Sequence, residues 1–214
     1  MQRAYEQIDW EVRNSRLKRI ILGSASPRRR ELLEQIGITF EIVTSGKDEV
    51  YNSTIPAEIV KELAQMKAEN VSEEVLEKEG RLCDVVVIGA DTIVVRDGEI
   101  LGKPADEEDA FHMLKSLQGR AHQVYTGVAI LDFDENGVKN VTSHAERTEV
   151  FMCAMPDAEI EKYIASGEPM DKAGAYGIQG RFAAFIERIE GDYFNVVGFP
   201  LAYVYSQLKH FTEI

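Results

Sequence analysis

Asp91 is a carboxylate that comes directly after an apolar run typical of a buried strand. The run covers residues 84–88 and is followed by Gly89 and Ala90, and Thr92 comes directly after the acid. Small residues allow a backbone or a ligand to come close, and a carboxylate beside a buried strand is costly unless it has a partner. Such an acid can bind a divalent metal or accept a proton from water. We therefore take Asp91 as the candidate catalytic residue and as a candidate metal ligand.

A second group of polar residues, Ser24, Ser26, Arg28 and Arg29, lies between a predicted strand and a predicted helix. Ser26 is expected to be the N-cap and Pro27 the first helical residue. A helix N-terminus attracts anions through its free N–H groups and its dipole, and guanidinium groups match phosphate oxygens. The residues alone support a phosphate site and a capped helix with solvated arginines equally well. A Walker A loop is excluded, because its Gly-Lys-Ser/Thr ending is absent.

Three further charged residues become candidates only in combination with these groups. Glu49 lies in a polar loop, Lys67 on a predicted long helix, and Lys103 in the turn Gly-Lys-Pro. Taken singly, each is typical of a solvated surface charge, and helix lysines commonly lay their stems along the surface.

The segment 171–180 combines three glycines and two alanines with a lysine, a tyrosine and a glutamine. Small residues indicate close backbone approach, and loops of such selective composition often carry function. The amide of Gln179 has both donors and an acceptor, so it can read the edge of a nucleobase. The alternative is a flexible loop without a ligand.

Composition excludes several classes of protein. The chain has 214 residues and a net charge of −13, which argues against a nucleic acid polymer as partner because duplex binding needs a basic face. The four histidines and two cysteines show no metal-ligand spacing, so a zinc site or a Ser-His-Asp triad has little support. There is no apolar segment long enough for a membrane helix and no signal-peptide core, so we expect a cytoplasmic protein with no membrane partner.

Strand and helix signals alternate along the chain, which predicts an α/β fold with a mixed twisted sheet flanked by helices. Residues 1–17 are predicted to form a helical N-terminal extension without chemistry, and residues 18–214 a single domain. The expected strands are 19–22, 40–43, 84–95, 99–101, 122–133, 140–154 and 182–189, and the expected helices are 28–35, 56–79, 105–117, 156–165 and a last one from 200.

Six motifs stand together in this order: Ile-Leu-Gly-Ser-Ala-Ser-Pro-Arg-Arg, Gly-Ala-Asp-Thr-Ile-Val, Leu-Gly-Lys-Pro, Tyr-Thr-Gly-Val-Ala, Asp-Lys-Ala-Gly-Ala-Tyr-Gly-Ile-Gln-Gly and Asn-Val-Val-Gly-Phe-Pro-Leu. As a set they resemble the Maf family of nucleoside triphosphate pyrophosphatases. The resemblance covers about residues 18–208 and leaves the first seventeen residues outside. Gly23 stands where the family usually has alanine, and Phe199 where leucine is commoner; neither position has a polar role.

The resemblance implies an elongated fold related to inosine triphosphatase, with two lobes around a cleft, and a Maf-like catalytic domain over 18–214. It implies cleavage of a small-molecule nucleoside triphosphate between its α and β phosphates, with a divalent cation such as Mg²⁺ or Mn²⁺, and a homodimer is also expected. The implied roles are proton acceptor for Asp91, metal ligand for Glu49 and Asp91, substrate binding for Ser24, Arg28, Arg29, Lys67 and Lys103, and substrate choice for Arg28, Thr92 and Gln179.

The branch of the family with Ala-Asp-Thr prefers dTTP and UTP, whereas the branch acting on 7-methyl-GTP has Ser-Asp-Gln. Thr92 therefore favours the pyrimidine branch. Two alternatives stay open at this point. The substrate could carry a modified pyrimidine or a different base, or the protein could be a non-catalytic regulator of cell division and septum formation.

Overall fold

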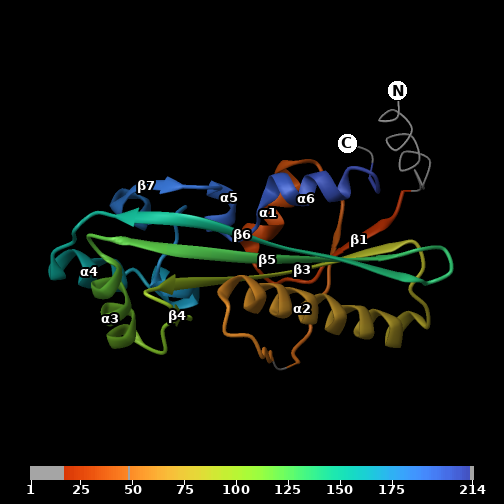
Figure 1. Cartoon of the computed structure of the whole chain (residues 1–214), viewed down its shortest axis with the longest axis horizontal. Coiled ribbons are helices and arrows are strands. Elements are labelled where there is room, and N and C mark those ends of the chain that lie inside the picture. Colours follow the sequence, from red (N-terminus) through yellow and green to blue (C-terminus); the bar gives the residue numbers. More distant parts are fainter. Residues whose placement is uncertain (1–16, 48, 213–214) are drawn as a thin grey trace.

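The computed structural model describes residues 17–47 and 49–212. The helix expected over residues 1–17 therefore lies, apart from Leu17, outside the described residues. Within them, a seven-stranded mixed sheet forms the centre of an elongated molecule (Figure 1). The strands are β1 Arg19–Leu22, β2 Glu41–Ile42, β3 Val85–Arg96, β4 Glu99–Leu101, β5 Ala121–Phe133, β6 Lys139–Met152 and β7 Ile186–Glu190.

The strand order is β2-β1-β3-β5-β6-β7, and β4 also pairs with β3. Strand β1 is parallel to β2 and to β3, and all other pairs are antiparallel. Hairpin turns join β3 to β4 and β5 to β6, whereas crossovers through helices join β1 to its two parallel partners. The predicted mixed sheet is confirmed.

Helices cover both faces of this sheet (Figure 1). Helix α2 lies along one face, α1 and α6 lie on the opposite face, and α3 and α4 pack at the far end. The helices are α1 Pro27–Gln35, α2 Pro56–Glu79, α3 Glu107–Leu117, α4 Asp157–Ile164, α5 Tyr193–Val197 and α6 Leu201–Leu208, with 3₁₀ turns η1 Glu168–Asp171, η2 Ala173–Ala175 and η3 Arg181–Phe185. None of the described helices is long and apolar enough to cross a membrane.

Strand β3 separates these layers by the alternation of its side chains. Val86 and Ile88 pack into the core under α1 and α6, whereas Val85 and Val87 pack against α2. Successive side chains of a strand point to opposite faces, and a strand covered on both faces is apolar throughout. The same alternation sends Asp91 to the α2 face and Thr92 to the α1 face.

Two glycines determine how closely α2 approaches the sheet. A Cβ on Gly127 would lie 2.0 Å from the carbonyl oxygen of Val60, and one on Gly89 would lie 2.1 Å from that of Ala64. Neither position therefore has room for any side chain. Because α2 rests on the bare backbone of β3 and β5 here, the helix residues that follow, including Lys67, are held close to Asp91.

The strand expected over residues 182–189 is wrong for its first four residues. Residues 181–185 form η3 instead, and β7 starts only at Ile186. Phe182 is fully buried against the rings of Tyr163 and Tyr176, and this packing prevents its segment from extending into the sheet. An apolar run has the same appearance in both settings, so its pattern could not separate them.

The expected start of α1 is confirmed, with Ser26 as the N-cap residue and Pro27 as the first helical residue, although the side chain of Ser26 makes no capping hydrogen bond. The short helix α5 was not predicted. The side chain of Asp192 caps it by accepting a hydrogen bond from the backbone N–H of Phe194 at 2.8 Å.

Candidate active site

A gap along one edge of β3 creates the candidate site. The pairing of β1 with β3 ends at Ile88, and the pairing of β4 with β3 starts at Val94. Residues 89–93 therefore have no neighbouring strand on that side within the described chain. A cavity of about 620 Å³ lies over this gap. Since the strand edge is open, side chains from both faces of β3 reach the same space.

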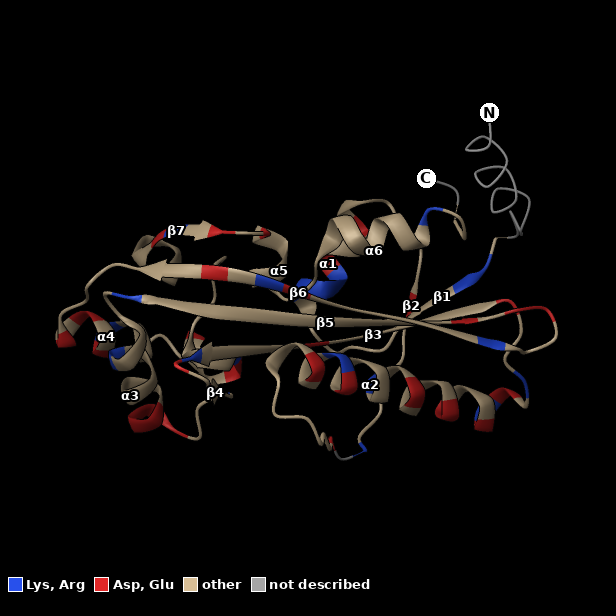
Figure 2. Cartoon of the chain, viewed as in Figure 1, with Lys and Arg blue, Asp and Glu red and all other residues tan. Residues whose placement is uncertain are grey.

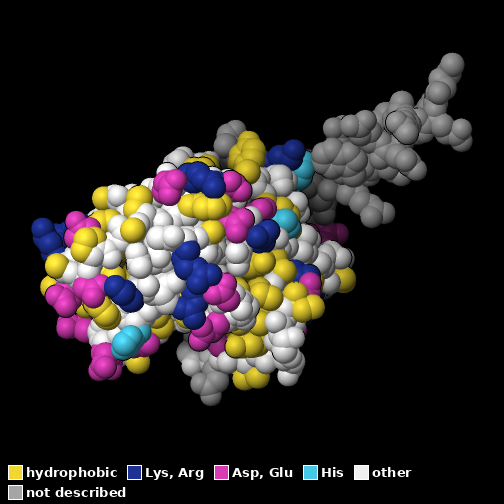
Figure 3. Space-filling model, turned by 60° about the vertical axis from the view of Figure 1, so that its left-hand side comes forward, with side chains coloured by type: hydrophobic (Ala, Val, Ile, Leu, Met, Phe, Trp, Pro, Cys, Tyr) yellow, Lys and Arg dark blue, Asp and Glu magenta, His cyan; other side chains and the backbone are white. Residues whose placement is uncertain are grey.

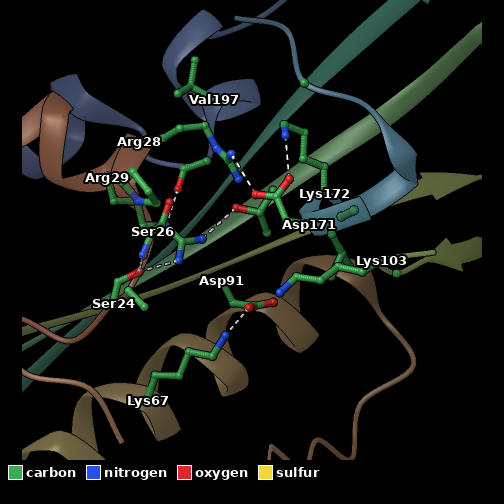
Figure 4. A pocket seen from close by; sticks show the side chains of 18 of the residues that line it. Ser24, Ser26, Arg28, Arg29, Lys67, Asp91, Lys103, Asp171, Lys172 and Val197 are labelled. Carbon is green, nitrogen blue, oxygen red and sulfur yellow. Dashed lines mark hydrogen bonds and ion pairs between the residues drawn. The ribbon is translucent and has the colours of Figure 1, made fainter. Parts of the chain in front are cut away.

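Every residue singled out as a candidate in the sequence lines this cavity. The first turn of α1, helix α2, strand β3, the turn at 102–103 and the 171–180 segment each contribute to its walls (Figure 4). The candidates that meet there are Ser24, Arg28, Arg29, Glu49, Lys67, Asp91, Thr92, Lys103 and Gln179. The structure thus brings together residues that are more than 150 positions apart in the chain.

Asp91 and Glu49 converge on one ammonium group. The Nζ of Lys67 lies 2.5 Å from Oδ1 of Asp91 and 3.1 Å from Oε1 of Glu49. The side chain of Asp91 is 14% exposed and that of Glu49 is 49% exposed, so the buried carboxylate lies deeper in the cavity. Two carboxylates around one cationic position form a local site for positive charge.

These two acids fit a divalent cation by the chemistry of the donor set. The described residues contain no group of three or more His, Cys, Asp or Glu that could enclose a metal ion by themselves. Mg²⁺ typically takes one or two carboxylates and completes its shell with water and substrate phosphates. Glu49 and Asp91 match that pattern, with phosphate oxygens supplying further ligands.

Arg29 is held rigidly on the opposite side of β3. Its Nε donates to the carbonyl of Gly198 at 2.8 Å, Nη1 to Oγ of Ser24 at 3.1 Å, and Nη2 to Oγ1 of Thr92 at 3.1 Å. Burial is the main cause that lowers the pKa of Arg29; Asp91 opposes this shift, and Arg28 adds to it. A guanidinium still keeps its proton in proteins, so Arg29 is a fixed positive charge.

Within residues 17–47 and 49–212, the hydroxyl group of Ser24 accepts two hydrogen bonds and donates none. Its oxygen accepts hydrogen bonds from Nη1 of Arg29 at 3.1 Å and from the backbone N–H of Ser26 at 3.2 Å. A hydroxyl has two acceptor lone pairs and one donor hydrogen, so both lone pairs are used. The remaining proton can only be donated, which suits an anionic ligand at the start of α1.

Arg28 reaches across the cavity toward a different segment. Its Nη1 lies 3.5 Å from Oδ2 of Asp171 in η1, and Asp171 also accepts from Nζ of Lys172 at 2.6 Å (Figure 4). Burial acts to raise the pKa of Asp171, but the Lys172 hydrogen bond and the charges of Lys172 and Arg28 hold it below its usual value. Asp171 and Lys172 were not assigned from the sequence. Their place in the 171–180 motif was the only signal for them.

Lys103 and Gln179 are exposed at the rim of the cavity. Among the described residues, neither makes a hydrogen bond or an ion pair. The side chain of Lys103 extends toward Asp91 in Figure 4. Both side chains are thus available to a ligand in the cavity.

The cavity concentrates positive charge in an acidic protein. Six basic and three acidic residues are among its described lining residues, although the whole chain has a net charge of −13. Acidic residues recur instead along α2 and α3 (Figure 2), and a group of basic side chains stands near the middle of the face in Figure 3. A local field of this sign attracts an anion despite the overall charge.

The comparisons with known proteins agree with this geometry. The Maf-like protein family matches residues 19–211. The chain belongs to this family. A relative from Pelotomaculum thermopropionicum named dTTP/UTP pyrophosphatase is 52% identical to this Maf-family chain, over 91% of the chain and 97% of the relative. Proteins of the same name from Agathobacter rectalis and Bacillus cereus are 49% and 48% identical, over 90% and 91% of this chain and 97% and 91% of their own lengths.

A solved structure of a nucleoside-triphosphatase, dITP/XTP pyrophosphatase, from Mycobacterium abscessus is also similar to this Maf-family chain. It is 15% identical with a TM-score of 0.34, and the match covers 64% of this chain and 76% of that one. A TM-score this low carries no argument about the fold, so the expected kinship with inosine triphosphatase stays a prediction.

Proposed function

We propose that this Maf-family chain is a nucleoside triphosphate pyrophosphatase that hydrolyses dTTP and UTP to the monophosphate and pyrophosphate. The observation that carries the proposal is the presence of Asp91 in one cavity with Arg28, Arg29, Lys67 and Lys103. Three relatives about half identical over nearly the full chain have names that state this activity.

In the proposed reaction, the oxygen of a water molecule attacks the α-phosphorus. The bond from that phosphorus to the oxygen bridging the α and β phosphates breaks, and pyrophosphate leaves. Asp91 accepts the proton of the water. Its Oδ1 is bonded to Lys67, and its Oδ2 has no hydrogen-bond partner in the described part of the chain, so Oδ2 is the proposed acceptor.

Most of the catalysis of such a transfer comes from positioning and neutralisation of charge. Arg29 and Ser24 are held by hydrogen bonds before any ligand arrives, so they need no reorganisation to meet phosphate oxygens. Arg28 and Lys103 are less constrained, since among the described residues Arg28 makes a single ion pair of 3.5 Å and Lys103 is exposed at the rim. We assign all four to the triphosphate.

Glu49 and Asp91 would hold the Mg²⁺ or Mn²⁺ ion in this proposal. When bound, the ion supplies positive charge to the phosphates of the substrate. Lys67 lies between the same two carboxylates, so its ammonium group keeps them neutralised and close together.

Arg28, Thr92 and Gln179 are the proposed determinants of the base. Thymine and uracil present two carbonyls and an N–H group, and the amide of Gln179 can both donate to and accept from such an edge. Its exposure on the cavity rim is compatible with that role.

A panel of nucleoside triphosphates at fixed Mg²⁺ tests the proposal through release of pyrophosphate. The panel includes dTTP, UTP, 5-methyl-UTP, CTP, GTP and 7-methyl-GTP. We expect the highest kcat/KM with dTTP and UTP. A higher kcat/KM with 7-methyl-GTP or a modified pyrimidine nucleotide would show that this compound, and not dTTP or UTP, is the preferred substrate. If no compound releases pyrophosphate, the enzymatic function is overturned and a non-catalytic role is favoured.

The homodimer and the cytoplasmic location stay predictions. Light scattering of the purified protein tests the first, and fractionation of cells tests the second.

A further inference from the structure

A ring of hydrogen bonds links Arg29 to two sequence motifs that have no role in the proposed reaction. These motifs are Tyr-Thr-Gly-Val-Ala at 125–129 and Asn-Val-Val-Gly-Phe-Pro-Leu at 195–201. The first provides Thr126 from β5, and the second provides Asn195 and Gly198 from α5 and the turn after it.

The ring can be followed from Arg29 in both directions. On one side, its Nη2 lies 3.1 Å from Oγ1 of Thr92, which lies 2.9 Å from Oγ1 of Thr126, which lies 2.9 Å from the carbonyl oxygen of Asn195. On the other side, its Nε donates to the carbonyl of Gly198 at 2.8 Å, and the N–H of Gly198 donates to the carbonyl of Asn195 at 2.9 Å. Both paths end on one carbonyl group.

The ring determines which way each hydroxyl points. The carbonyl of Asn195 can only accept, so Thr126 uses its single proton there. Thr92 must then donate its own proton to Thr126. The oxygen of Thr92 is consequently an acceptor toward Arg29, and its proton is directed away from the cavity.

Burial makes this arrangement rigid. Thr126 and Asn195 are both 0% exposed. The side-chain Nδ2 of Asn195 donates to the carbonyl of Val124 at 3.1 Å and to Oγ1 of Thr148 at 2.9 Å, which anchors α5 to β5 and β6. Thr126 itself does not line the cavity, so its effect on a ligand is indirect and reaches Arg29 through Thr92 or through Asn195 and Gly198.

The backbone at Gly198 is tightly packed against the hydrogen-bonded ring. Its φ of 112° lies in the region that favours glycine, and a Cβ there would lie 3.2 Å from Oγ1 of Thr92. A side chain at position 198 would therefore crowd the hydroxyl of Thr92 and strain the backbone.

We propose that Thr126 is a positioning residue that holds the guanidinium of Arg29 in place for the phosphates of the substrate. The proposal rests on the proposed function in one respect, the role of Arg29 as a ligand of the triphosphate. Without the Thr126 hydroxyl, Thr92 loses the acceptor for its proton, its hydroxyl can rotate, and Nη2 of Arg29 loses a fixed partner.

The experiment compares Thr126→Val, which keeps the shape and removes the hydroxyl, with Thr126→Ser, which restores the hydroxyl. Ser72→Ala is the matched control, because Ser72 is also buried and its hydroxyl donates to the carbonyl of Ala68 within α2 at 2.8 Å, away from the ring around Arg29. Kd for inorganic triphosphate is measured by calorimetry, and KM and kcat by release of pyrophosphate from dTTP. Thr126→Ala provides a second hydroxyl-free variant if Thr126→Val does not fold.

We expect Thr126→Val to raise Kd and KM about tenfold, because the hydrogen bond between the charged guanidinium of Arg29 and Thr92 loses its fixed geometry. Thr126→Ser and Ser72→Ala should stay within about twofold of wild type in both. In an Arg29→Ala background, Thr126→Val should have no further effect on Kd, because its effect passes through Arg29.

Unchanged Kd and KM in a folded Thr126→Val protein would overturn the proposal, and so would an equal loss in Thr126→Ser or an undiminished effect in the Arg29→Ala background. The binding measurement does not depend on hydrolysis. If the wild type binds triphosphate and Thr126→Val weakens it while no nucleotide is hydrolysed, the proposed function fails and the positioning role stands.

Discussion

The Nζ of Lys67 lies 2.5 Å from Oδ1 of Asp91, so a lysine of α2 neutralises the carboxylate in the gap of β3. Glycine at 89 and 127 makes this contact possible, because α2 could not lie so near the sheet with side chains at either position. Packing between backbones therefore sets the distance between two charged groups of the candidate site.

Replacement of Asp91 by Asn should remove most of the activity. The amide cannot accept a proton from water, so we expect kcat to fall by at least about 100-fold. The fold should persist, because Lys67 keeps Glu49 as a partner. Steady-state release of pyrophosphate and circular dichroism measure the two effects. Asp157→Asn is the control, since Asp157 pairs with Lys115 outside the cavity. Near wild-type turnover of the Asp91→Asn variant would disprove the role of the Asp91 carboxylate.

Removal of divalent cations should abolish turnover without unfolding the protein. Glu49 and Asp91 need phosphate oxygens to complete a metal shell, so the ion contributes to the reaction and adds little to the stability of the chain alone. Treatment with EDTA should stop pyrophosphate release, and Mg²⁺ or Mn²⁺ should restore it, while Tm stays the same. Full activity in EDTA would contradict the metal requirement, and a large loss of Tm would indicate a structural ion.

Replacement of Gly127 by Ala should weaken both stability and activity. The new Cβ would lie 2.0 Å from the carbonyl oxygen of Val60, so α2 must shift away from the sheet. Overpacking of this kind costs about 3 kcal/mol of unfolding free energy, and the shift also separates Lys67 from Asp91. Urea denaturation and kcat measure the two losses. Gly46→Ala has open space around it and is the control; a Gly127→Ala protein as stable as that control would contradict the close packing.

Stability should fall on acidification because of His122. This residue is 0% exposed, its Nε2 lies 2.7 Å from the hydroxyl of Tyr176, and burial lowers its pKa from 6.5 to about 4. Below pH 6.5 the imidazole of His122 becomes protonated in the unfolded chain, whereas in the folded protein it stays neutral until about pH 4. The free energy of unfolding should therefore decrease through that window, by about 3 kcal/mol in total.

Urea midpoints between pH 7.5 and pH 4.5 test this prediction. His122→Gln should lose less stability than wild type over the interval, because it lacks the titrating group. His112→Gln should behave like wild type, since the side chain of His112 is 70% exposed. An identical pH dependence in wild type and His122→Gln would show that His122 does not cause the loss.

Local chemistry in the sequence predicted much of the sheet and singled out Asp91, Gln179 and the serine–arginine group at the start of α1. The roles expected for Glu49, Lys67 and Lys103 came from the family resemblance. The long apolar run before Asp91 indicated β3, and Pro56 and Gly80 marked the ends of α2 correctly. These signals are short-range, because the period of apolar residues and the conformational limits of proline and glycine act within one element. The turn at 181–185 was missed because Phe182 is placed by aromatic contacts from other segments.

The sequence by itself therefore determined most of the elements, but not α5 or the 3₁₀ turns, and the residue types from which the site is built. Only the tertiary structure decided that β1 and β4 leave one edge of residues 89–93 of β3 without a neighbouring strand, while the other edge pairs with β5. It also decided that Thr92, Thr126 and Asn195 form one chain of hydrogen bonds to Arg29. The physical reason is that such contacts depend on strand order and register across the sheet. Neither quantity is encoded in the propensities of neighbouring residues.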